Sequence, residues 1–307
     1  MTSPTRPAPP AWSLAVVAML LIQLSSALSV TVIDAVGAGG ASWLRTCFGA
    51  LFLLLIVRPS LRSIRRADVP NLLLLGTVTG LMTTLFLAAL DRIPLGTAVA
   101  IEFLGPLTVA AVMSRRRRAL VWPALAFVGV VLLTEPWQGA TDALGILFAL
   151  LGGACWGLYN LLTQRVGDRF SGISGLAYTI PIAAVVTTII GVPSVIEGTL
   201  TLPIILLAAG IALLTPVISF GLEMLALRRM THTAFGTLLA IEPAFAIIIG
   251  LIVLSQTPGV LQVIGIVIVV IAGAAAQRDV TRSRPAVSSD GAIPPAENPE
   301  REEGEPR

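Results

Sequence analysis

The chain has 307 residues, of which 55% are hydrophobic and 12% charged, with a formal net charge of +3 and a mean hydropathy of +0.90. A soluble domain is typically about 25% charged, so this composition excludes an ordinary soluble enzyme, a secreted disulfide scaffold and a disordered protein. What remains is an all-α polytopic membrane protein, because the apolar stretches are much longer than the roughly ten-residue strands of a membrane barrel.

Ten apolar stretches are long enough to cross a bilayer, whose core of about 30 Å requires about 20 helical residues. In chain order they are 12–33, 41–57, 71–90, 95–113, 119–135, 142–163, 172–191, 202–225, 234–254 and 259–276. Glycines and prolines, among them Gly39, Gly40, Pro94 and Pro258, fall at or near the breaks. The sequence therefore predicts ten transmembrane helices.

The basic residues are all arginines, and their distribution predicts the orientation of the chain. Alternate connections and the C-terminal tail hold nearly all of those outside the spans: Arg58, Arg62, Arg65, Arg66, 115–118, Arg165, Arg169, Arg228, Arg229, Arg278, Arg282 and Arg284. Among the opposite connections only that between the third and fourth spans holds one, Arg92. Arginine-rich loops stay inside, so we expect both termini in the cytoplasm, in a bacterial inner membrane. The run 115–118 is interpreted as a topology anchor and not as a nucleic-acid contact.

The two ends of the chain are predicted to lie outside the bilayer. Residues 1–11 form a short cytoplasmic segment without a persuasive cleavage site, so the first span is expected to be retained. Residues 277–307 are rich in proline and glutamate and are predicted to form a disordered cytoplasmic tail.

A motif of the fourth span recurs in the ninth. Residues 96–102 read GTAVAIE and residues 236–242 read GTLLAIE. Residues 128–131 of the fifth span likewise resemble residues 264–267 of the tenth. The repeat unit is therefore five helices long, and because five is odd, the second copy enters the membrane from the opposite side.

This pattern divides the chain into two inverted five-helix repeats, residues 12–136 and 137–276. Inverted repeats are typical of secondary transporters, whose substrate site lies near the midplane between them.

Two glutamates inside the spans are the first candidates for such a site, since ionisable residues there are costly and usually functional. Glu102 precedes Pro106 by four residues, so the Glu102 carbonyl loses its usual helical partner. Glu242 directly precedes Pro243, which frees another carbonyl in the same way. Each half thus combines a carboxylate with a free backbone acceptor, which could bind an ammonium group or a proton. The alternative is that both glutamates are hydrogen-bonded packing residues.

A third glutamate, Glu223, shares a helical face with Thr215 and Ser219. Pro216 is expected to loosen this helix. The face is polar enough to line a cavity. Pairing of Glu223 with the arginines at 228 and 229 is the alternative, because Glu223 is near the predicted cytoplasmic end.

The sixth span carries Trp156, Tyr159 and Asn160 behind a run of small residues. An amide facing lipid is improbable, so Asn160 should face the interior, either in the wall of a site or in a hydrogen bond between helices.

Other polar residues within the spans are first interpreted as structural. Arg45 lies one turn inside the second span and is expected to reach the membrane surface or to pair with Asp34. Gln23 and Ser26, and the face of the third span formed by 77, 80 and 84, are interpreted as packing residues before cavity lining.

The sequence offers no motif for hydrolysis, metal binding or ATP use. Cys47 and Cys155 have no disulfide or metal-ligand spacing, and the single histidine, His232, cannot build a His-rich site. No glycine-rich phosphate loop precedes a basic residue. We expect neither an enzyme nor a bound cofactor or metal.

Several segments resemble the drug/metabolite transporter superfamily of the EamA type, and most closely its threonine/homoserine exporter branch. They are 102–106 (EFLGP), 154–159 (ACWGLY), 222–227 (LEMLAL), 235–238 (FGTL) and 242–244 (EPA). The resemblance covers roughly residues 12–276 and does not extend to Asn160 or to the acidic tail. It implies a ten-helix inverted-repeat fold and proton-coupled export of small metabolites from the cytoplasm.

The leading prediction is therefore a proton antiporter that exports amino acids such as threonine or homoserine. The ammonium of a zwitterion requires a carboxylate, which Glu102 or Glu242 could supply. Its carboxylate requires donors, which Asn160, Trp156, Tyr159 and helix N-termini could supply. Burial disfavours a charged carboxylate, so protonation could couple proton entry to substrate release.

Three other functions fit the sequence less well. Multidrug efflux by the same fold would favour a more aromatic cavity than an aromatic content of 6% indicates. A membrane-embedded lipid enzyme would need paired acidic metal motifs or a nucleophile with a base. A structural or receptor subunit without transport would not need the inverted repeat. Both a monomer and a homodimer fit the sequence.

Overall fold

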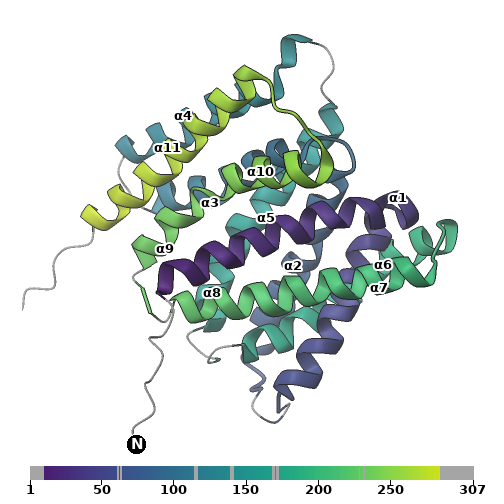
Figure 1. The fold of residues 1–307 in the computed structure, drawn as a ribbon. Helices are drawn as coiled ribbons and strands as arrows, with labels where there is room; N and C mark the ends of the chain where they lie inside the picture. Colours follow the sequence, from purple (N-terminus) through teal and green to yellow (C-terminus); the bar gives the residue numbers. More distant parts are fainter. Residues whose placement is uncertain are drawn as a thin grey trace, which may run out of the picture.

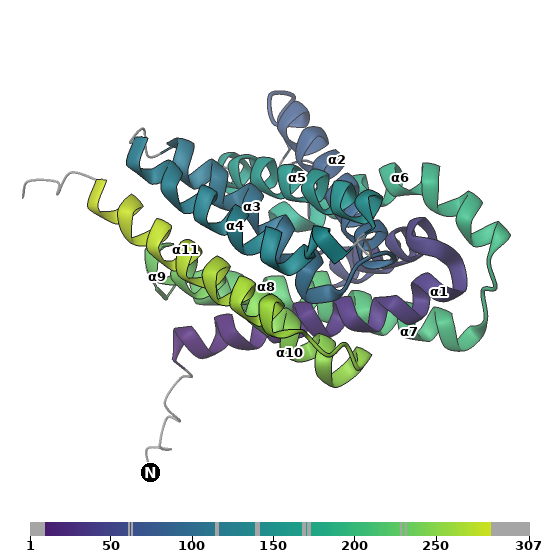
Figure 2. The same ribbon diagram turned by 90° about the horizontal axis from the view of Figure 1, so that it is seen from above.

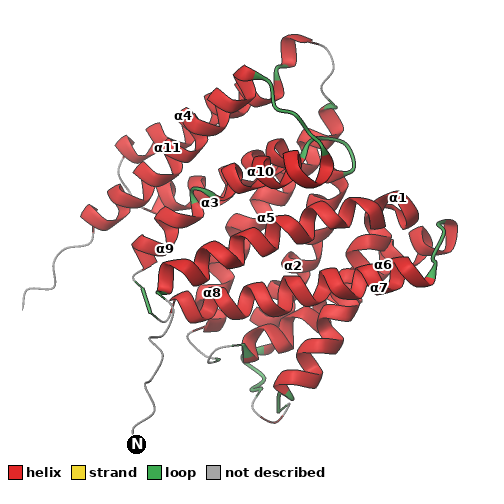
Figure 3. Ribbon diagram, viewed as in Figure 1, coloured by secondary structure: helices red, strands yellow, loops and turns green. Residues whose placement is uncertain are grey.

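A computed structural model describes residues 10–60, 62, 64–113, 117–138, 142–167, 170, 173–227, 229–230 and 232–283. The described residues are helices joined by short connections, without strands (Figures 1 and 3). The helices are α1 (Ala11–Val57), α2 (Val69–Leu90), α3 (Leu95–Met113), α4 (Val121–Thr134), α5 (Ala143–Gly167), α6 (Ser174–Glu197), α7 (Leu202–Ala212), α8 (Ser219–Leu227), α9 (His232–Leu239), α10 (Glu242–Leu254) and α11 (Val260–Ser283). Short 3₁₀ turns at Arg117–Leu120 and Pro136–Gln138 flank α4, and a π-helical segment, η4 (Leu213–Ile218), joins α7 to α8.

Seven of the described helical stretches are long and apolar enough to cross a membrane. The stretches Arg118–Thr134 and Val260–Ala276 are also apolar but shorter. Helices suit this composition because each backbone N–H and C=O finds its partner within the same segment, as an apolar solvent requires. The predicted all-α membrane class is confirmed at this level.

Helix α1 has 47 residues and is interrupted at Gly37. A straight helix of this length would extend about 70 Å, more than twice the thickness of a bilayer core. Gly37 has φ 73° and ψ 165°, a conformation that glycine adopts easily because it has no Cβ. The break falls within the predicted connection between the first two spans.

Two further helical stretches are interrupted near their middle. Thr215, in η4, has φ −141° and ψ 119°, so the α7–η4–α8 stretch is loosened beside Pro216 as predicted. Between α9 and α10 the chain makes a turn at Ala240 and Ile241, and Pro243 lies in the first turn of α10. Proline is favoured there because the first N–H groups of a helix have no helical partner.

The apolar part of α11 ends at Ala276, where the sequence places the end of the last span, and the helix itself continues to Ser283. The last apolar turn continues into polar residues that still form a helix. Residues 1–9, 114–116 and 284–307, to which the sequence assigns a terminal segment, part of the arginine run and the acidic tail, lie outside the described residues.

Helices α4 and α11 run side by side at one edge of the molecule (Figures 1 and 2). A Cβ on Gly129 would lie 2.6 Å from the backbone oxygen of Gly265, and a Cβ on Gly265 would lie 2.5 Å from that of Gly129. The two backbones therefore touch, which only small residues at the interface permit.

The second half of α1 packs closely on α6. Trp43 donates a hydrogen bond from Nε1 to Thr188 Oγ1 at 2.9 Å, and the hydroxyls of Thr46 and Thr187 are 2.8 Å apart. A Cβ on Gly39 would lie 2.8 Å from Ser194 Oγ. These contacts hold the two helices together on the far side of the Gly37 break from Gln23.

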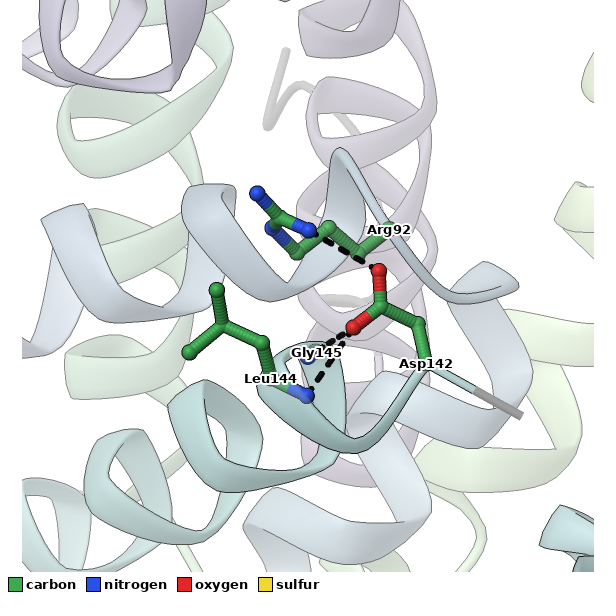
Figure 4. Close-up of polar contacts among 4 residues, drawn as sticks. All are labelled: Arg92, Asp142, Leu144 and Gly145. Atoms are coloured by element: carbon green, nitrogen blue, oxygen red, sulfur yellow. Dashed lines mark hydrogen bonds and ion pairs between the residues drawn. The ribbon is translucent and has the colours of Figure 1, made fainter.

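Arg92 and Asp142 join two connections at one end of the bundle (Figure 4). Arg92 Nη1 donates to Asp142 Oδ2 at 2.9 Å, while Asp142 Oδ1 accepts from the backbone N–H groups of Leu144 and Gly145 at 2.9 and 3.1 Å. Asp142 therefore caps α5. These backbone hydrogen bonds, that of Gly145 first, and the Arg92 guanidinium lower the pKa of the Asp142 carboxyl below its usual value.

Candidate functional site

A cavity of about 370 Å³ lies among the helices, lined by residues of both predicted repeats. Its volume falls at the lower end of the range for small-molecule sites. The structure brings all six predicted binding residues to its wall: Glu102, Trp156, Tyr159, Asn160, Glu223 and Glu242. The three predicted helix-breaking prolines, Pro106, Pro216 and Pro243, lie in the segments that carry lining residues.

Glu102 lies on α3, which is pressed against α5. A Cβ on Gly153 would lie 2.6 Å from the Glu102 backbone oxygen, and a Cβ on Gly105 would collide with the Gly153 carbonyl. A Cβ on Gly152 would lie 2.8 Å from Glu102 Oε1. The side chain of Glu102 is only 8% exposed, and Oε1 has no hydrogen-bond partner in the described structure.

Glu242 lies at the first position of α10 and is only 5% exposed. Its Oε1 accepts a hydrogen bond from Gln23 Nε2, on the first half of α1, at 3.1 Å. A helix N-terminus also favours negative charge. Glu242 is thus held in place by a side chain from the opposite half of the chain.

The structural interpretation of Arg45 is corrected, and Gln23 combines the packing role with its cavity-lining alternative. Both residues line the cavity, with Ser26 one turn from Gln23. Arg45 and Asp34, both described, form no ion pair, and Asp34 is exposed. Arg45 Nη1 is buried without a hydrogen-bond partner. The sequence signal for Arg45 was available, since a basic residue within an apolar run is a functional candidate by default.

The packing interpretation of the third span agrees with the structure at two positions. Thr84 shares a 2.8 Å hydrogen bond with Ser42 of α1, and a Cβ on Gly80 would lie 3.1 Å from the Ala183 backbone oxygen. The cavity is lined instead by neighbours on the same helix, including Met82, Thr83 and Phe86.

Asn160 faces the interior, beside Trp156 and Tyr159 on α5. The Trp156 ring meets Phe103 edge-on, with centroids 6.1 Å apart and planes at 61°. This packing orients Trp156 at the cavity wall.

Glu223 lines the cavity on α8. Its neighbour Thr215 also lines it, with its hydroxyl 3.1 Å from that of Ser219. Glu223 and Arg229, both described, form no ion pair, and Arg228 is outside the described residues. The cavity alternative for Glu223 therefore agrees with the structure.

The charges of the cavity are unequal. One guanidinium, that of Arg45, faces three carboxylates, those of Glu102, Glu223 and Glu242. Such a wall offers partners to a solute with both charge signs and also holds carboxylates that can accept protons.

Comparison with known proteins places the chain among transporters. Residues 143–275 match the model of the EamA-like transporter family. The chain is 37% identical over 253 residues to the threonine/homoserine exporter RhtA of Escherichia coli K12, covering 81% of this chain and 85% of that protein. It is 35% identical over 259 residues to RhtA of Salmonella typhimurium LT2, covering 83% and 87%. A more distant relative, the pseudopaline exporter CntI of Pseudomonas aeruginosa, is 22% identical over 86% of this chain and 95% of its own.

A solved crystal structure shares the fold. It superimposes with a TM-score of 0.59 at 17% identity and covers 88% of this chain and 98% of its own. The RhtA similarity is high enough, over enough of both chains, to confirm the resemblance seen in the sequence. The protein is a multi-pass membrane protein, and it belongs to the EamA-like transporter family, near its RhtA branch.

Proposed function

We propose that this protein exports small amino acids, threonine and homoserine first, from the cytoplasm in exchange for protons. The observation that carries the proposal is the cavity lined by one guanidinium and three carboxylates. The similarity to RhtA supports the substrate, because the name of that relative specifies threonine and homoserine.

Ten membrane crossings form part of the proposal. Seven helical stretches are long enough by themselves. Helix α1 counts as two crossings because it breaks at Gly37. The two shorter apolar helices, Arg118–Thr134 and Val260–Ala276, bring the total to ten. The contact between α4 and α11 supports the inverted repeat. Gly129 and Gly265, which match in the repeat, each touch the backbone oxygen of the other, as residues related by a two-fold axis do.

The cavity extends toward the end of the bundle proposed to be cytoplasmic. Its lining continues from Glu102 and Glu242 to Phe170 and Gly175, beside the arginine-bearing connection between α5 and α6. With both termini in the cytoplasm, this arrangement corresponds to a state ready to load solute from inside the cell.

The excess of carboxylates in the cavity supports proton coupling. Several negative charges close together in a low-dielectric space repel one another and lose hydration. Protons or a cationic group of the solute can neutralise them, so binding of one favours release of the other. Antiport results when the carboxylates bind protons and the solute in alternation.

The test is growth of an export-deficient bacterium that expresses the chain, under toxic excess of individual amino acids or lipophilic cations. Resistance to threonine or homoserine is expected. Resistance to lipophilic cations alone would instead favour multidrug efflux and overturn the proposed substrate.

Proton coupling requires a second measurement, of threonine efflux from proteoliposomes with and without a pH gradient. The double variant Glu102→Gln with Glu242→Gln should lose the acceleration by the gradient, while Glu197→Gln, an exposed residue at the end of α6, should keep it. If the double variant responds to the gradient as the wild type does, these glutamates do not couple proton movement.

A further inference from the structure

All the buried side-chain atoms that lack a hydrogen-bond partner in the described part of the chain belong to residues of one cavity. They are Gln23 Oε1, Arg45 Nη1, Glu102 Oε1 and Thr163 Oγ1, and these residues all line the cavity described above. A buried polar atom without a partner destabilises the folded state, so such atoms are few in native proteins. Their concentration here indicates partners supplied by a solute.

The unpartnered atoms include one cationic donor and one anionic acceptor. Arg45, on the second half of α1, offers N–H groups, and Glu102, on α3, offers a carboxylate oxygen. These two side chains, both described, form no ion pair with each other, so neither charge neutralises the other by direct contact. A guanidinium binds a carboxylate especially well because its N–H groups form a planar fork.

We propose that Arg45 binds the carboxylate of the transported amino acid and that Glu102 binds its ammonium group. The inference rests on the proposed function and specifies the chemical class: a solute with a free α-carboxylate and a free α-ammonium. It assigns the carboxylate to Arg45 in place of the neutral donors Asn160, Trp156 and Tyr159. Gln23 Oε1 remains available for the rest of the solute.

The different hydrogen bonding of the two glutamates supports this assignment. Gln23 already donates to Glu242 Oε1 at 3.1 Å, whereas Glu102 Oε1 is buried without a hydrogen-bond partner in the described residues. Glu102 Oε1 packs against α5, where a Cβ on Gly152 would lie 2.8 Å from it. Of these two glutamates, Glu102 is therefore the one with an oxygen that the described residues leave without a donor.

The experiment measures ligand-induced thermal stabilisation of the purified full-length chain in detergent, which gives an apparent Kd without requiring transport. The probes are L-threonine, L-threoninol, which lacks the carboxylate, and 3-hydroxybutyrate, which lacks the ammonium group. The wild type should bind threonine at least about 10-fold more tightly than either analogue, because each analogue loses a charged hydrogen bond.

The variants assign the two ends of the solute. Arg45→Gln should weaken threonine binding about 10- to 100-fold and change threoninol binding little. Glu102→Gln should weaken threonine binding comparably and change 3-hydroxybutyrate binding little. Arg45→Lys, which keeps the charge but loses the fork, should give an intermediate loss. Arg66→Gln, an exposed arginine between α1 and α2, should match the wild type with every probe.

The outcomes separate this inference from the proposed function. If the wild type binds threonine but Arg45→Gln still prefers threonine to threoninol as strongly, the role of Arg45 is wrong and the export function stands. Equal binding of threonine and threoninol by the wild type overturns the inference even if Arg45→Gln fails to fold. If the wild type binds no α-amino acid, the proposed function fails as well.

Discussion

Glu102 and Glu242 occupy matching positions in the repeated motif, but their surroundings differ. Glu242 begins a helix and accepts a hydrogen bond from Gln23. Glu102 lies inside α3, and its Oε1 faces Gly152 without a hydrogen-bond partner in the described structure. Of the two repeated glutamates, Glu242 is therefore anchored by a hydrogen bond, whereas the open glutamate, Glu102, has an oxygen without a donor among the described residues. The repeat places a glutamate at both positions, and the helix packed against each glutamate, α1 or α5, makes their surroundings different.

The largest expected effect is on threonine efflux, and it tests whether substitution of Glu102 lowers efflux more than substitution of Glu242. Glu102→Gln should lower threonine efflux from proteoliposomes about 10- to 100-fold, because a charged hydrogen bond to the solute is lost. Glu242→Gln should lower it less than about 10-fold, since an amide oxygen can still accept from Gln23. Equal losses in initial rate, at equal amounts of folded protein, would contradict the difference between the two glutamates.

Two adjacent glycines of α5 contact different parts of Glu102, Gly153 its backbone and Gly152 its side chain. Gly153→Ala places a Cβ 2.6 Å from the Glu102 backbone oxygen and should lower the free energy of unfolding by about 1–3 kcal/mol. Gly152→Ala meets only the end of the side chain and should lower stability less, while reducing efflux several-fold. Thermal unfolding and efflux of both variants test this. A Gly152→Ala variant with wild-type efflux would show that the position of the Glu102 side chain against Gly152 does not matter for transport.

The anchored carboxylate is tested by a double-mutant cycle. Gln23→Leu removes the donor to Glu242, and its cost in stability should fall by about 1 kcal/mol when Glu242 is already glutamine, because an amide oxygen accepts a weaker hydrogen bond than a carboxylate does. The same substitution combined with Glu102→Gln should be additive within the error of the unfolding measurement. Coupling of Gln23 to Glu102 as strong as to Glu242 would mean that the two carboxylates share one network.

The smallest effect on transport is expected for Asp142, a hydrogen-bonded carboxylate outside the cavity that serves as a control for Glu102 and Glu242. Its pKa is lowered by the Gly145 N–H and by Arg92, so the carboxylate contributes stability above its ordinary pKa of about 3.9. That contribution is lost as the pH falls through the lowered pKa. Asp142→Asn should therefore unfold at a lower temperature at pH 7, and the difference from the wild type should shrink at acidic pH. A difference independent of pH would exclude this titration as its source.

Much of the fold could be predicted because the signals for helices and their interruptions lie within short segments of the sequence. Apolar length predicts the helices, the glycines near 39 predict the break in α1, and Pro216 and Pro243 predict the interruptions beside Thr215 and Glu242. The end of α11 was not predictable in this way, since a helix can continue into polar residues when nothing stops it.

The site was predicted only in part. Glutamates in apolar spans are conspicuous in any sequence, so Glu102, Glu223 and Glu242 could be identified. Arg45 is interpreted from the sequence as structural because it lies near the end of a span, with Asp34 nearby in the chain. Gln23 is interpreted first as a packing residue because nothing in the sequence identifies its partner. Their actual neighbours come from α3 and α10, which only the tertiary packing reveals.

Gly37 has a mechanical consequence. Gln23 and Arg45 lie on the same helix α1, on opposite sides of the glycine whose φ of 73° breaks it. Rotation about this one residue would act as a hinge: it would swing the two arms of α1 relative to each other and change the span between the Glu242 anchor and the Arg45 guanidinium. A change in this single pair of backbone torsions would therefore be enough to alter the distance between two charged groups of the cavity.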